Sequence, residues 1–370
     1  MALAEILAER IRADGPIPVS DFMAQALGHP QHGYYMHRDP FGTGGDFTTA
    51  PEISQMFGEL IGLWCAIVWQ GMGSPSRVVL AEIGPGRGTL MADLLRAART
   101  LPAFASAVET WLVETSPALR NRQAQTLAAE KVQWVERFEQ LPDGPLLLVA
   151  NELFDALPIR QLEKQAGVWR ERLVGLDKGG KFVFRLGDAV DSPQVAPAPQ
   201  VAPAPQVAPA PQVAPDGAVA EICQPGRDLA AAIGRRVVKG GGAALIIDYG
   251  APVSGTGDTL QAVKGHAYHP ALADPGQVDL TAHVDFQALA EAATAAGAKV
   301  HGPVSQGRFL LRLGIEERTV MLMRHANPEQ AADMAGRARR LIDPAEMGTL
   351  FQVLALANPL LSLPPGLDPA

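Results

Sequence analysis

The strongest constraint on the fold is the alternation of short apolar segments with amphipathic segments along most of the 370-residue sequence. Apolar runs bounded by turn residues predict strands, and apolar residues repeated every three or four positions predict helices. The predicted strands cover residues 77–84, 110–116, 131–136, 146–150, 243–250, 299–304 and 308–314. The predicted helices cover residues 88–99, 117–130, 227–242 and 284–298. This pattern predicts an α/β fold, a Rossmann-like and mostly parallel sheet with helices on both faces.

The first 75 residues do not follow this alternation. Residues 20–27 and 52–72 predict a short and a long helix, whereas residues 33–51 are rich in Gly, Pro and Thr and predict a loop. A loop of this length inside a compact domain is usually functional. We therefore expect three parts in chain order: an N-terminal cap and lid over 1–75, a core over 76–315, and a C-terminal helical extension over 316–370.

Two segments are expected to interrupt the core, a Pro-rich repeat over 193–215 and a loop over 250–282. In the repeat, PQVAPA occurs three times and is followed by PQVAP. Its frequent prolines remove hydrogen-bond donors and favour polyproline II, which predicts a stiff, solvated insertion. An expanded surface loop explains it most simply, and a partner-binding tether is the alternative. Because core strands are predicted on both sides, the repeat divides the core rather than ending it.

A glycine-rich turn, AEIGPGRGTL, follows the first core strand and leads into a helix. Glu82, Gly84, Gly86 and Gly88 form the pattern E-x-G-x-G-x-G, in which glycines let a ligand approach the main chain closely. Thr89 stands where a dinucleotide fingerprint needs its third glycine, and no lysine follows as in a P-loop. An acid at the strand end disfavours a pyrophosphate and suits a ligand with an ammonium group, such as S-adenosylmethionine. A purely structural strand-to-helix turn is the alternative.

The second core strand ends in Glu114. A carboxylate at this place accepts hydrogen bonds from the two hydroxyls of a ribose, as in dinucleotide folds. Together with Glu82 and the strand order, Glu114 strengthens the prediction of a nucleoside-containing cofactor.

Polar residues follow directly on the fourth strand, in LLLVANELFDALP. Ligands of such sheets bind outside the carboxyl ends of the strands, so Asn151, Glu152 and Asp155 are expected to face the cofactor. Two carboxylates suit a cationic acceptor, because a carboxylate can bind a guanidinium through two parallel hydrogen bonds. The alternative is a helix start, where Asn caps the helix and acids favour its first turn.

Other candidates are weaker. Asp46 and Thr48 in GDFTTAPEIS are expected to close over the cofactor, although the same stretch also resembles a helix start. Asp248 and Tyr249 end the fifth strand and either line the acceptor side or form a turn. The three histidines His266, His269 and His283 lack acid or cysteine spacing for a metal, so we expect no metal site.

Composition excludes several classes of protein. A net charge of −8 argues against a broad nucleic-acid or anionic-membrane surface. The longest apolar stretch, residues 61–69, is too short to span a bilayer. The two cysteines, Cys65 and Cys223, lie far apart, and the N-terminal residues resemble neither a signal nor a transit peptide. We therefore expect a cytoplasmic protein without membrane insertion; its oligomeric state stays open.

Five stretches together resemble the MidA-like family of S-adenosylmethionine-dependent methyltransferases. They are HGYYMHRDPFGTGGDFTTAPEISQMFGELIGLW, LAEIGPGRGTLMADLLRA, NELFDALPIRQ, GGAALIIDYG and DLTAHVDFQALA, and they span almost the whole chain in order. The PQVAPA repeat is the departure from the family pattern, and nothing about it is carried over.

The resemblance implies a class I methyltransferase core with an N-terminal cap and an insertion on the substrate side. The cofactor-binding residues it implies are Glu82, Gly84, Pro85, Gly86, Gly88 and Glu114. The mitochondrial member of the family is a protein arginine methyltransferase needed for assembly of respiratory complex I, which implies a protein substrate, with a complex I subunit as the candidate. The alternatives are methylation of a small cationic molecule, or a non-catalytic assembly factor that uses the fold as a scaffold.

Overall fold

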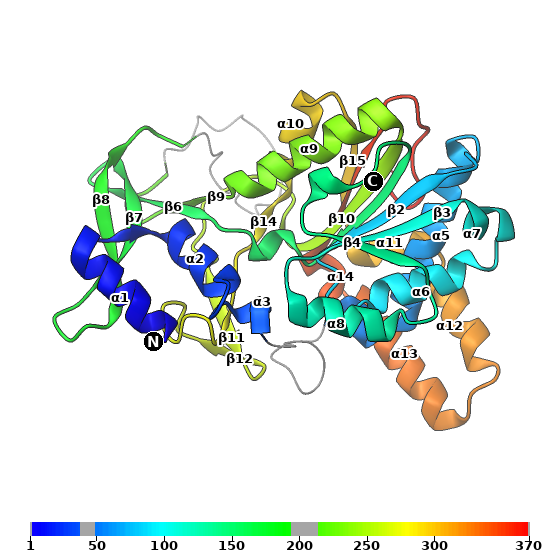
Figure 1. Cartoon of the computed structure of the whole chain (residues 1–370), viewed down its shortest axis with the longest axis horizontal. Coiled ribbons are helices and arrows are strands. Elements are labelled where there is room, and N and C mark those ends of the chain that lie inside the picture. Colours follow the sequence, from blue (N-terminus) through cyan, green and yellow to red (C-terminus); the bar gives the residue numbers. More distant parts are fainter. Residues whose placement is uncertain (1, 38–48, 194–213, 369–370) are drawn as a thin grey trace, which may run out of the picture.

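The computed structural model describes residues 2–37, 49–193 and 214–368, and its larger lobe is built on a mostly parallel sheet (Figure 1). In spatial order, the strands of this sheet are β15 (Lys299–Ser305), β16 (Phe351–Ala357), β10 (Gly242–Ala251), β5 (Leu146–Asn151), β2 (Val78–Ile83), β3 (Val108–Val113) and β4 (Val132–Val135), with β14 (Val284–Asp285) beside β10. Only β16 runs antiparallel to its neighbours among these described strands. The predicted α/β fold is confirmed.

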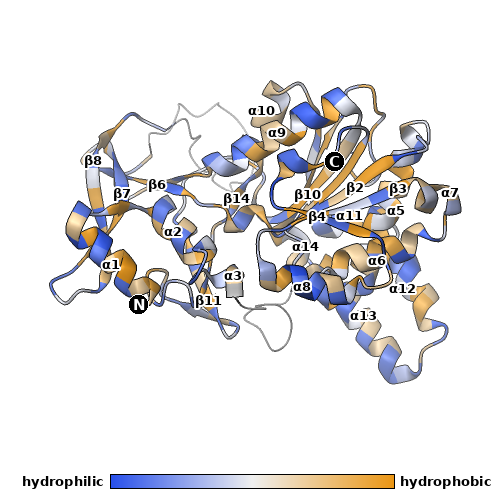
Figure 2. Cartoon of the chain, viewed as in Figure 1, coloured by the Kyte–Doolittle hydropathy of each residue, from blue (hydrophilic) through white to orange (hydrophobic). Residues whose placement is uncertain are grey.

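Helices cover both faces of the sheet because its central strands are apolar on both sides. In β5, Leu147 and Val149 pack into the core under α5 (Gln55–Gly71), α6 (Thr89–Ala98) and α11 (Gln306–Arg312). Leu146 and Leu148 point the other way, into the core under α9 (Gln224–Gly240) and α10 (Phe286–Ala295). Figure 2 shows these strands as the most hydrophobic part of the lobe. Each buried leucine stabilises the fold by about 1.5–3 kcal/mol.

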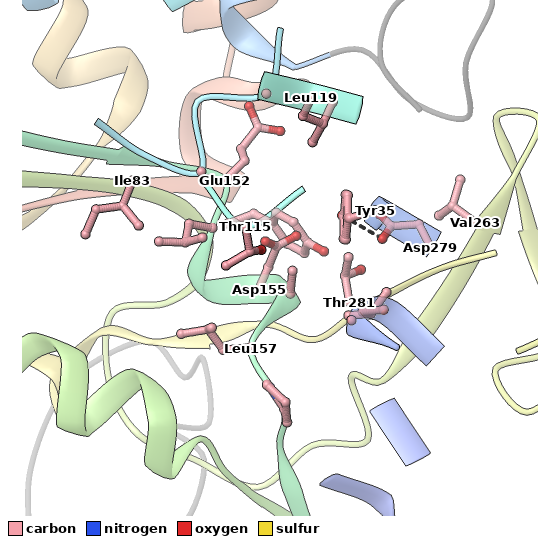
Figure 3. Close-up of a pocket in the computed structure, with 18 of the residues that line it drawn as sticks. Tyr35, Ile83, Thr115, Leu119, Glu152, Asp155, Leu157, Val263, Asp279 and Thr281 are labelled. Carbon is pink, nitrogen blue, oxygen red and sulfur yellow. Dashed lines mark hydrogen bonds between the residues drawn. The ribbon is translucent and has the colours of Figure 1, made fainter. Parts of the chain in front are cut away.

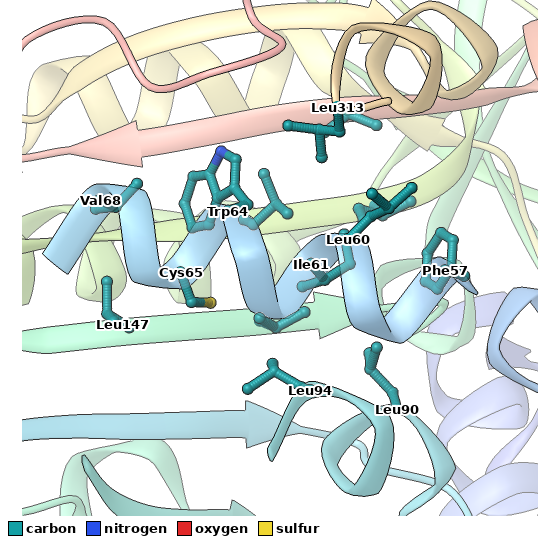
Figure 4. Close-up of a cluster of buried hydrophobic side chains, with 14 of the residues drawn as sticks. Phe57, Leu60, Ile61, Trp64, Cys65, Val68, Leu90, Leu94, Leu147 and Leu313 are labelled. Carbon is teal, nitrogen blue, oxygen red and sulfur yellow. The ribbon is translucent and has the colours of Figure 1, made fainter. Parts of the chain in front are cut away.

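Helix α5 is the main covering element of one face (Figure 4). Phe57, Ile61 and Trp64 are fully buried against the sheet and its neighbours. Gly62 lets α5 approach α6 closely, since a Cβ there would lie 2.8 Å from the carbonyl oxygen of Leu94. The long helix expected over 52–72 is interrupted: α4 (Ala50–Ile53) ends at Ser54, whose extended backbone separates it from α5.

The strand expected over 308–314 is wrong, because residues 308–312 belong to α11 and the last two residues follow its end. Phe309 and Leu310 are buried, whereas Leu311 and Arg312 face outward, which is the one-sided exposure of a helix. The remaining connecting elements are α7 (Pro102–Ala107), α8 (Pro117–Thr126) and η1 (Phe138–Gln140).

The C-terminal extension is only partly helical. It contains α12 (Ile315–Met323), α13 (Pro328–Ile342) and α14 (Met347–Leu350), and then the wholly buried strand β16. The helical expectation for 316–370 is therefore wrong over 351–357, where the chain returns to fill the sheet between β10 and β15. A short apolar run has the same periodicity in a buried strand and in a buried helix, so sequence pattern did not separate the two.

A smaller lobe lies beside the core (Figure 1). It consists of the N-terminal helices and two segments inserted into the core, one after β5 and one after β10. One antiparallel sheet contains β1 (Ile17–Pro18), β6 (Arg160–Gln165), β7 (Val168–Leu176), β8 (Phe182–Val190) and β9 (Val219–Ile222). The loop expected over 250–282 is partly wrong, because it contains a second sheet of β11 (Gln261–Lys264), β12 (Ala267–His269) and β13 (Asp279–Thr281). Helices α1 (Leu3–Asp14), α2 (Val19–Gly28) and α3 (Tyr34–His37) complete the lobe, and the first two share one apolar core with both insertions.

Most of the Pro-rich repeat, residues 194–213, lies outside the described residues. The chain enters it from β8 and leaves it toward β9, which pairs with β6. Strands β5 before the repeat and β10 after it are neighbours in the core sheet. Within the described ranges, no helix is long and apolar enough to cross a membrane.

Candidate active site

A cavity of about 860 Å³ opens where the strand order of the core sheet reverses (Figure 3). Strands β2 and β5 are neighbours, and from them the chain continues outward in opposite directions, to β3 on one side and β10 on the other. The crevice at such a switch point is the usual ligand site of a doubly wound sheet. The volume is near the upper end of the range for ligand pockets, which leaves room for two ligands.

The glycine-rich turn forms the cofactor end of this cavity. Gly84 and Gly86 line it, and both have positive φ, +66° and +52°. Positive φ at Gly84 favours glycine, and a Cβ there would also lie 2.8 Å from the end of the Leu153 side chain, which would have to move. Pro85 and Gly88 shape the turn without lining the cavity: the N–H of Gly88 donates to the carbonyl oxygen of Pro85 at 2.7 Å.

Two predicted acids flank the turn in different environments. Glu114 lines the cavity and accepts hydrogen bonds from the N–H of Ser116 at 2.8 Å and from Nε2 of Gln123 at 3.0 Å. Burial raises its pKa. Glu82 lies behind the cavity, where burial raises its pKa to about 8. Its Oε2 atom is buried and has no hydrogen-bond partner among the described residues.

Gln123 is a residue of this end that the sequence did not single out. Its Nε2 donates both to Glu114 and to the carbonyl oxygen of Gly86, the latter at 2.8 Å. Its Oε1 accepts from Nε1 of Trp134 at 2.9 Å, which fixes the orientation of the amide. One side chain of α8 therefore ties the glycine turn to the acid at the end of β3.

At the end of β5, Glu152 lines the cavity in a strained backbone conformation, with φ of +51°. Its Oε1 accepts from the N–H of Ala50 and from Nδ2 of Asn151, both at 3.0 Å. Burial, together with the neighbouring Asp155, raises the pKa of Glu152 to about 7. Asn151 does not itself line the cavity, and its buried Oδ1 has no partner among the described residues.

Asp155 lies in the 3-10 turn η2 (Phe154–Ala156) and also lines the cavity. Burial raises its pKa to about 6, and its buried Oδ1 atom has no hydrogen-bond partner within the described part of the chain. The helix-capping interpretation of Asn151 is wrong, because the residue at the N-cap of the turn is Leu153 and no side chain caps it.

Asp248 anchors this turn from β10 rather than lining the acceptor side. Its Oδ2 accepts from the N–H groups of Leu153, Phe154 and Asp155 at 3.1, 2.9 and 3.2 Å, and its Oδ1 accepts from the N–H of Tyr249. Burial and the carboxylates of Asp155 and Glu152 raise the pKa of Asp248. The turn interpretation therefore holds for Asp248.

The other end of the cavity, where the acceptor is expected, combines Tyr249 and His283, which the sequence analysis named, with residues that it did not mark. Tyr249 and His283 come from the core and stack edge to face at 5.5 Å. Tyr35, Asp279 and Thr281 come from the smaller lobe. The only signal for them was their position within the stretches that carry the family resemblance.

Two groups of predicted residues are not brought into the site. Asp46 and Thr48 lie outside the described residues. Of the three histidines, only His283 lines the cavity, while Nε2 of His269 lies 3.3 Å from Asp274. Within the described ranges, no group of three His, Cys, Asp or Glu side chains is placed to hold a metal.

A Rossmann-like sheet with a glycine turn and a strand-end acid at its switch point is typical of proteins that bind a nucleoside-containing cofactor. A family model described as that of S-adenosyl-L-methionine-dependent methyltransferases matches residues 60–304, and the chain belongs to this family. The family includes the MidA-like proteins that the sequence resembles, and its cofactor is S-adenosylmethionine.

Known relatives match over nearly the whole chain. A Drosophila melanogaster protein named mitochondrial protein arginine methyltransferase NDUFAF7 homolog is 38% identical, with 96% of this chain and 84% of the relative covered. The human protein arginine methyltransferase NDUFAF7 is 33% identical, with 94% and 81% covered. A solved structure of a Burkholderia thailandensis protein bound to S-adenosyl-homocysteine is 32% identical, has a TM-score of 0.78, and aligns over 100% of this chain and 93% of its own.

Proposed function

We propose that the protein transfers methyl groups from S-adenosylmethionine to arginine side chains of a protein substrate. The observation that carries this proposal is the charge of the acceptor end. Glu152, Asp155 and Asp279 line it together with Tyr35 and Tyr249, and the described cavity lining contains no lysine or arginine. Burial lowers the pKa of His283, so this histidine is neutral at pH 7. Such a site favours a cationic acceptor and provides aromatic rings for its flat face.

A protein substrate is favoured over a small molecule by the mouth of the cavity. Tyr268 belongs to the lining but is 84% exposed, so the cavity opens to solvent at the hairpin of β11 and β12. A side chain carried by a protein can enter through such an opening, whereas a small-molecule site usually buries most of its ligand.

The residues at the glycine turn fit the cofactor. We assign its binding to Glu82, Gly84, Gly86 and Glu114, with Pro85 and Gly88 holding the turn. When bound, S-adenosylmethionine supplies an electrophilic methyl group to an attacking nitrogen. Glu114 lines the cavity and keeps acceptor capacity for ribose hydroxyls beyond its two bonds, whereas Glu82 would act from behind the turn.

We assign the acceptor chemistry to Glu152 and Asp155, with Asn151 as the residue that positions Glu152. A guanidinium is a poor nucleophile because its charge is delocalised. Two carboxylates on one side of the guanidinium accept its N–H groups and fix the orientation of its plane. They also draw the positive charge toward the nitrogens that they bind, so the nitrogen nearer the cofactor is better able to attack. A carboxyl with a pKa near 7 is also suited to take up the proton that this nitrogen loses.

The proposal is tested by incubating the protein with methyl-labelled S-adenosylmethionine and cell extract, and then identifying the labelled amino acid after acid hydrolysis. Methylarginine is the expected product. Label on lysine or on a free metabolite would contradict the arginine assignment, and absence of all transfer would favour the non-catalytic scaffold.

Glu114→Ala is expected to weaken binding of S-adenosyl-homocysteine about 10- to 100-fold, the effect of losing hydrogen bonds to a charged acceptor. Calorimetry measures it directly. Glu109→Ala is the control, because Glu109 lies at the other end of β3 in an exposed pair with Arg77. Equal affinity in both variants would contradict the ribose role.

The rate of transfer is expected to rise with pH. The pKa values of Asp155 and Glu152 are raised to about 6 and about 7. Below these values the carboxyls are protonated, and they have no negative charge with which to bind a guanidinium. The value of kcat/KM for the acceptor should therefore increase through about pH 6 to 7 and level off above. Because the two groups interact, they titrate as a pair. A flat profile from pH 5 to 8 would contradict this assignment.

The proposal has two further parts, the identity of the substrate protein and the cellular compartment. A subunit of respiratory complex I is the candidate target implied by the family resemblance. The animal relatives are named mitochondrial, whereas the sequence led us to expect a cytoplasmic location. Mapping the labelled protein in extract fractions tests both points.

A further inference from the structure

The acceptor end contains a third carboxylate, Asp279, whose position is fixed by the smaller lobe. Asp279 begins β13, is only 4% exposed and lines the cavity. Its Oδ1 accepts a hydrogen bond from the hydroxyl of Tyr35 at 2.7 Å (Figure 3). Neither residue belongs to the core sheet, so the N-terminal cap and the insertion together place an acid opposite the β5 turn.

A backbone hydrogen bond fixes the strand that carries Asp279 relative to Asp155. The N–H of Ala282, which directly follows β13, donates to the main-chain oxygen of Asp155 at 3.0 Å. Tyr35 is an electrostatic neighbour of both carboxylates, and Figure 3 shows it hydrogen-bonded to Asp279. Asp279 and Asp155 therefore face the same space from two different lobes.

A second, independent observation indicates that this space takes a ligand. Oδ1 of Asp155 is buried and has no hydrogen-bond partner among the described residues, although the residue is only 7% exposed and lines the cavity. A buried carboxylate oxygen without a donor is rare in folded proteins unless a ligand or water supplies one.

We propose that Asp279 is an acceptor-binding residue that holds the guanidinium from the side opposite Glu152 and Asp155, and that Tyr35 positions it. The inference rests on the proposed arginine methylation. A guanidinium has five N–H donors in one plane, more than the β5 turn can engage from one side. An acid on the far side accepts the N–H groups that the β5 turn leaves unbound and fixes the plane of the guanidinium.

The test measures formation of methylarginine by the full-length protein in cell extract, with acetyl-Gly-Arg-Gly-amide added as a competing acceptor. When the extract supplies a limiting amount of acceptor, Asp279→Asn is expected to reduce the rate of methylarginine formation at least about 10-fold. It is also expected to raise the half-inhibitory concentration of the tripeptide by a similar factor. Affinity for S-adenosyl-homocysteine should stay unchanged, because Asp279 lies at the acceptor end.

Tyr35→Phe is the second variant, since it removes the hydrogen bond and keeps the ring. It should raise KM for the acceptor about threefold to tenfold with little change in kcat, as expected of a positioning residue. Asp274→Asn is the control. It removes an acid from the same insertion, where Asp274 pairs with Lys264 at 3.0 Å outside the cavity, and its rate should match that of the wild type.

The outcomes separate the two proposals. Absence of methylarginine from the wild-type reaction would overturn the arginine assignment and the role of Asp279 with it. Methylarginine from the wild type together with an unchanged rate in folded Asp279→Asn would overturn the role of Asp279 alone. A loss of cofactor affinity equal to the loss of rate would also overturn it, because the effect would then not be on the acceptor.

Discussion

Glu152→Gln is expected to lower the rate of methyl transfer at least about 100-fold, the scale for loss of a positioned catalytic carboxylate. The substitution keeps the shape of the side chain and an oxygen that can accept from the N–H of Ala50. It removes the negative charge that binds a guanidinium and the group that takes up a proton. Single-turnover transfer from labelled S-adenosylmethionine measures the effect.

Binding of S-adenosyl-homocysteine provides the internal control for this variant. Its affinity should change by no more than about twofold, since the cofactor contacts that we assign lie at the glycine turn and Glu114. Glu139→Gln, at an exposed position, makes the same chemical change away from the cavity and should leave transfer unaffected. Transfer within a few-fold of wild type in Glu152→Gln would mean that this carboxylate only ties α4 to β5.

Asp248→Ala is expected to lower the free energy of unfolding by about 3 kcal/mol. Three backbone N–H groups of the turn after β5 donate to one carboxylate oxygen, and Asp248 is fully buried. Alanine leaves these donors without an acceptor, at about 1–3 kcal/mol for each buried group left unpaired, and relief of repulsion with Asp155 offsets part of this. Urea unfolding followed by fluorescence measures the change.

Transfer should also be lost in Asp248→Ala, because the turn sets the direction of Glu152 and Asp155. Asp216→Ala is the control, since Asp216 accepts one backbone N–H at 2.8 Å on the exposed surface. We expect that exposed change to cost less than about 1 kcal/mol. Equal stability of the two variants would show that Asp248 does not hold the turn.

Several features of the fold could be predicted because they depend on local pattern. Strands such as β2 and β5 are buried on both faces, so their residues are apolar except for Glu82 and Asn151 near the carboxyl ends, and the strands are easy to recognise. The glycine turn could be predicted because a close strand-to-helix connection at positive φ restricts residue choice. Pattern failed at β16 and α11, where short apolar segments fit a strand and a helix equally well and their neighbours in space decide.

The candidate site also contains some residues that the sequence predicted and others that it did not. The sequence placed acids at the ends of β3 and β5, and the order of parallel strands implied that they share one edge of the sheet. It did not mark Gln123, Tyr35 or Asp279, because Gln123 acts through a contact with Gly86, and Tyr35 and Asp279 act through a contact with each other, both between residues far apart in the chain. It also left the role of Asp248 open, since a strand-end acid looks the same whether it faces a ligand or holds a turn.

For LLLVANELFDALP, the sequence by itself determined a buried strand that ends in acids at the ligand edge of an α/β sheet. The tertiary structure decided what each acid does. Glu152 and Asp155 face the cavity because Asp248, from a neighbouring strand, fixes the turn between them, and Asp279 faces them from the smaller lobe. Burial by these distant segments also raises the pKa values of the two acids, and burial depends on the whole fold rather than on neighbouring residues.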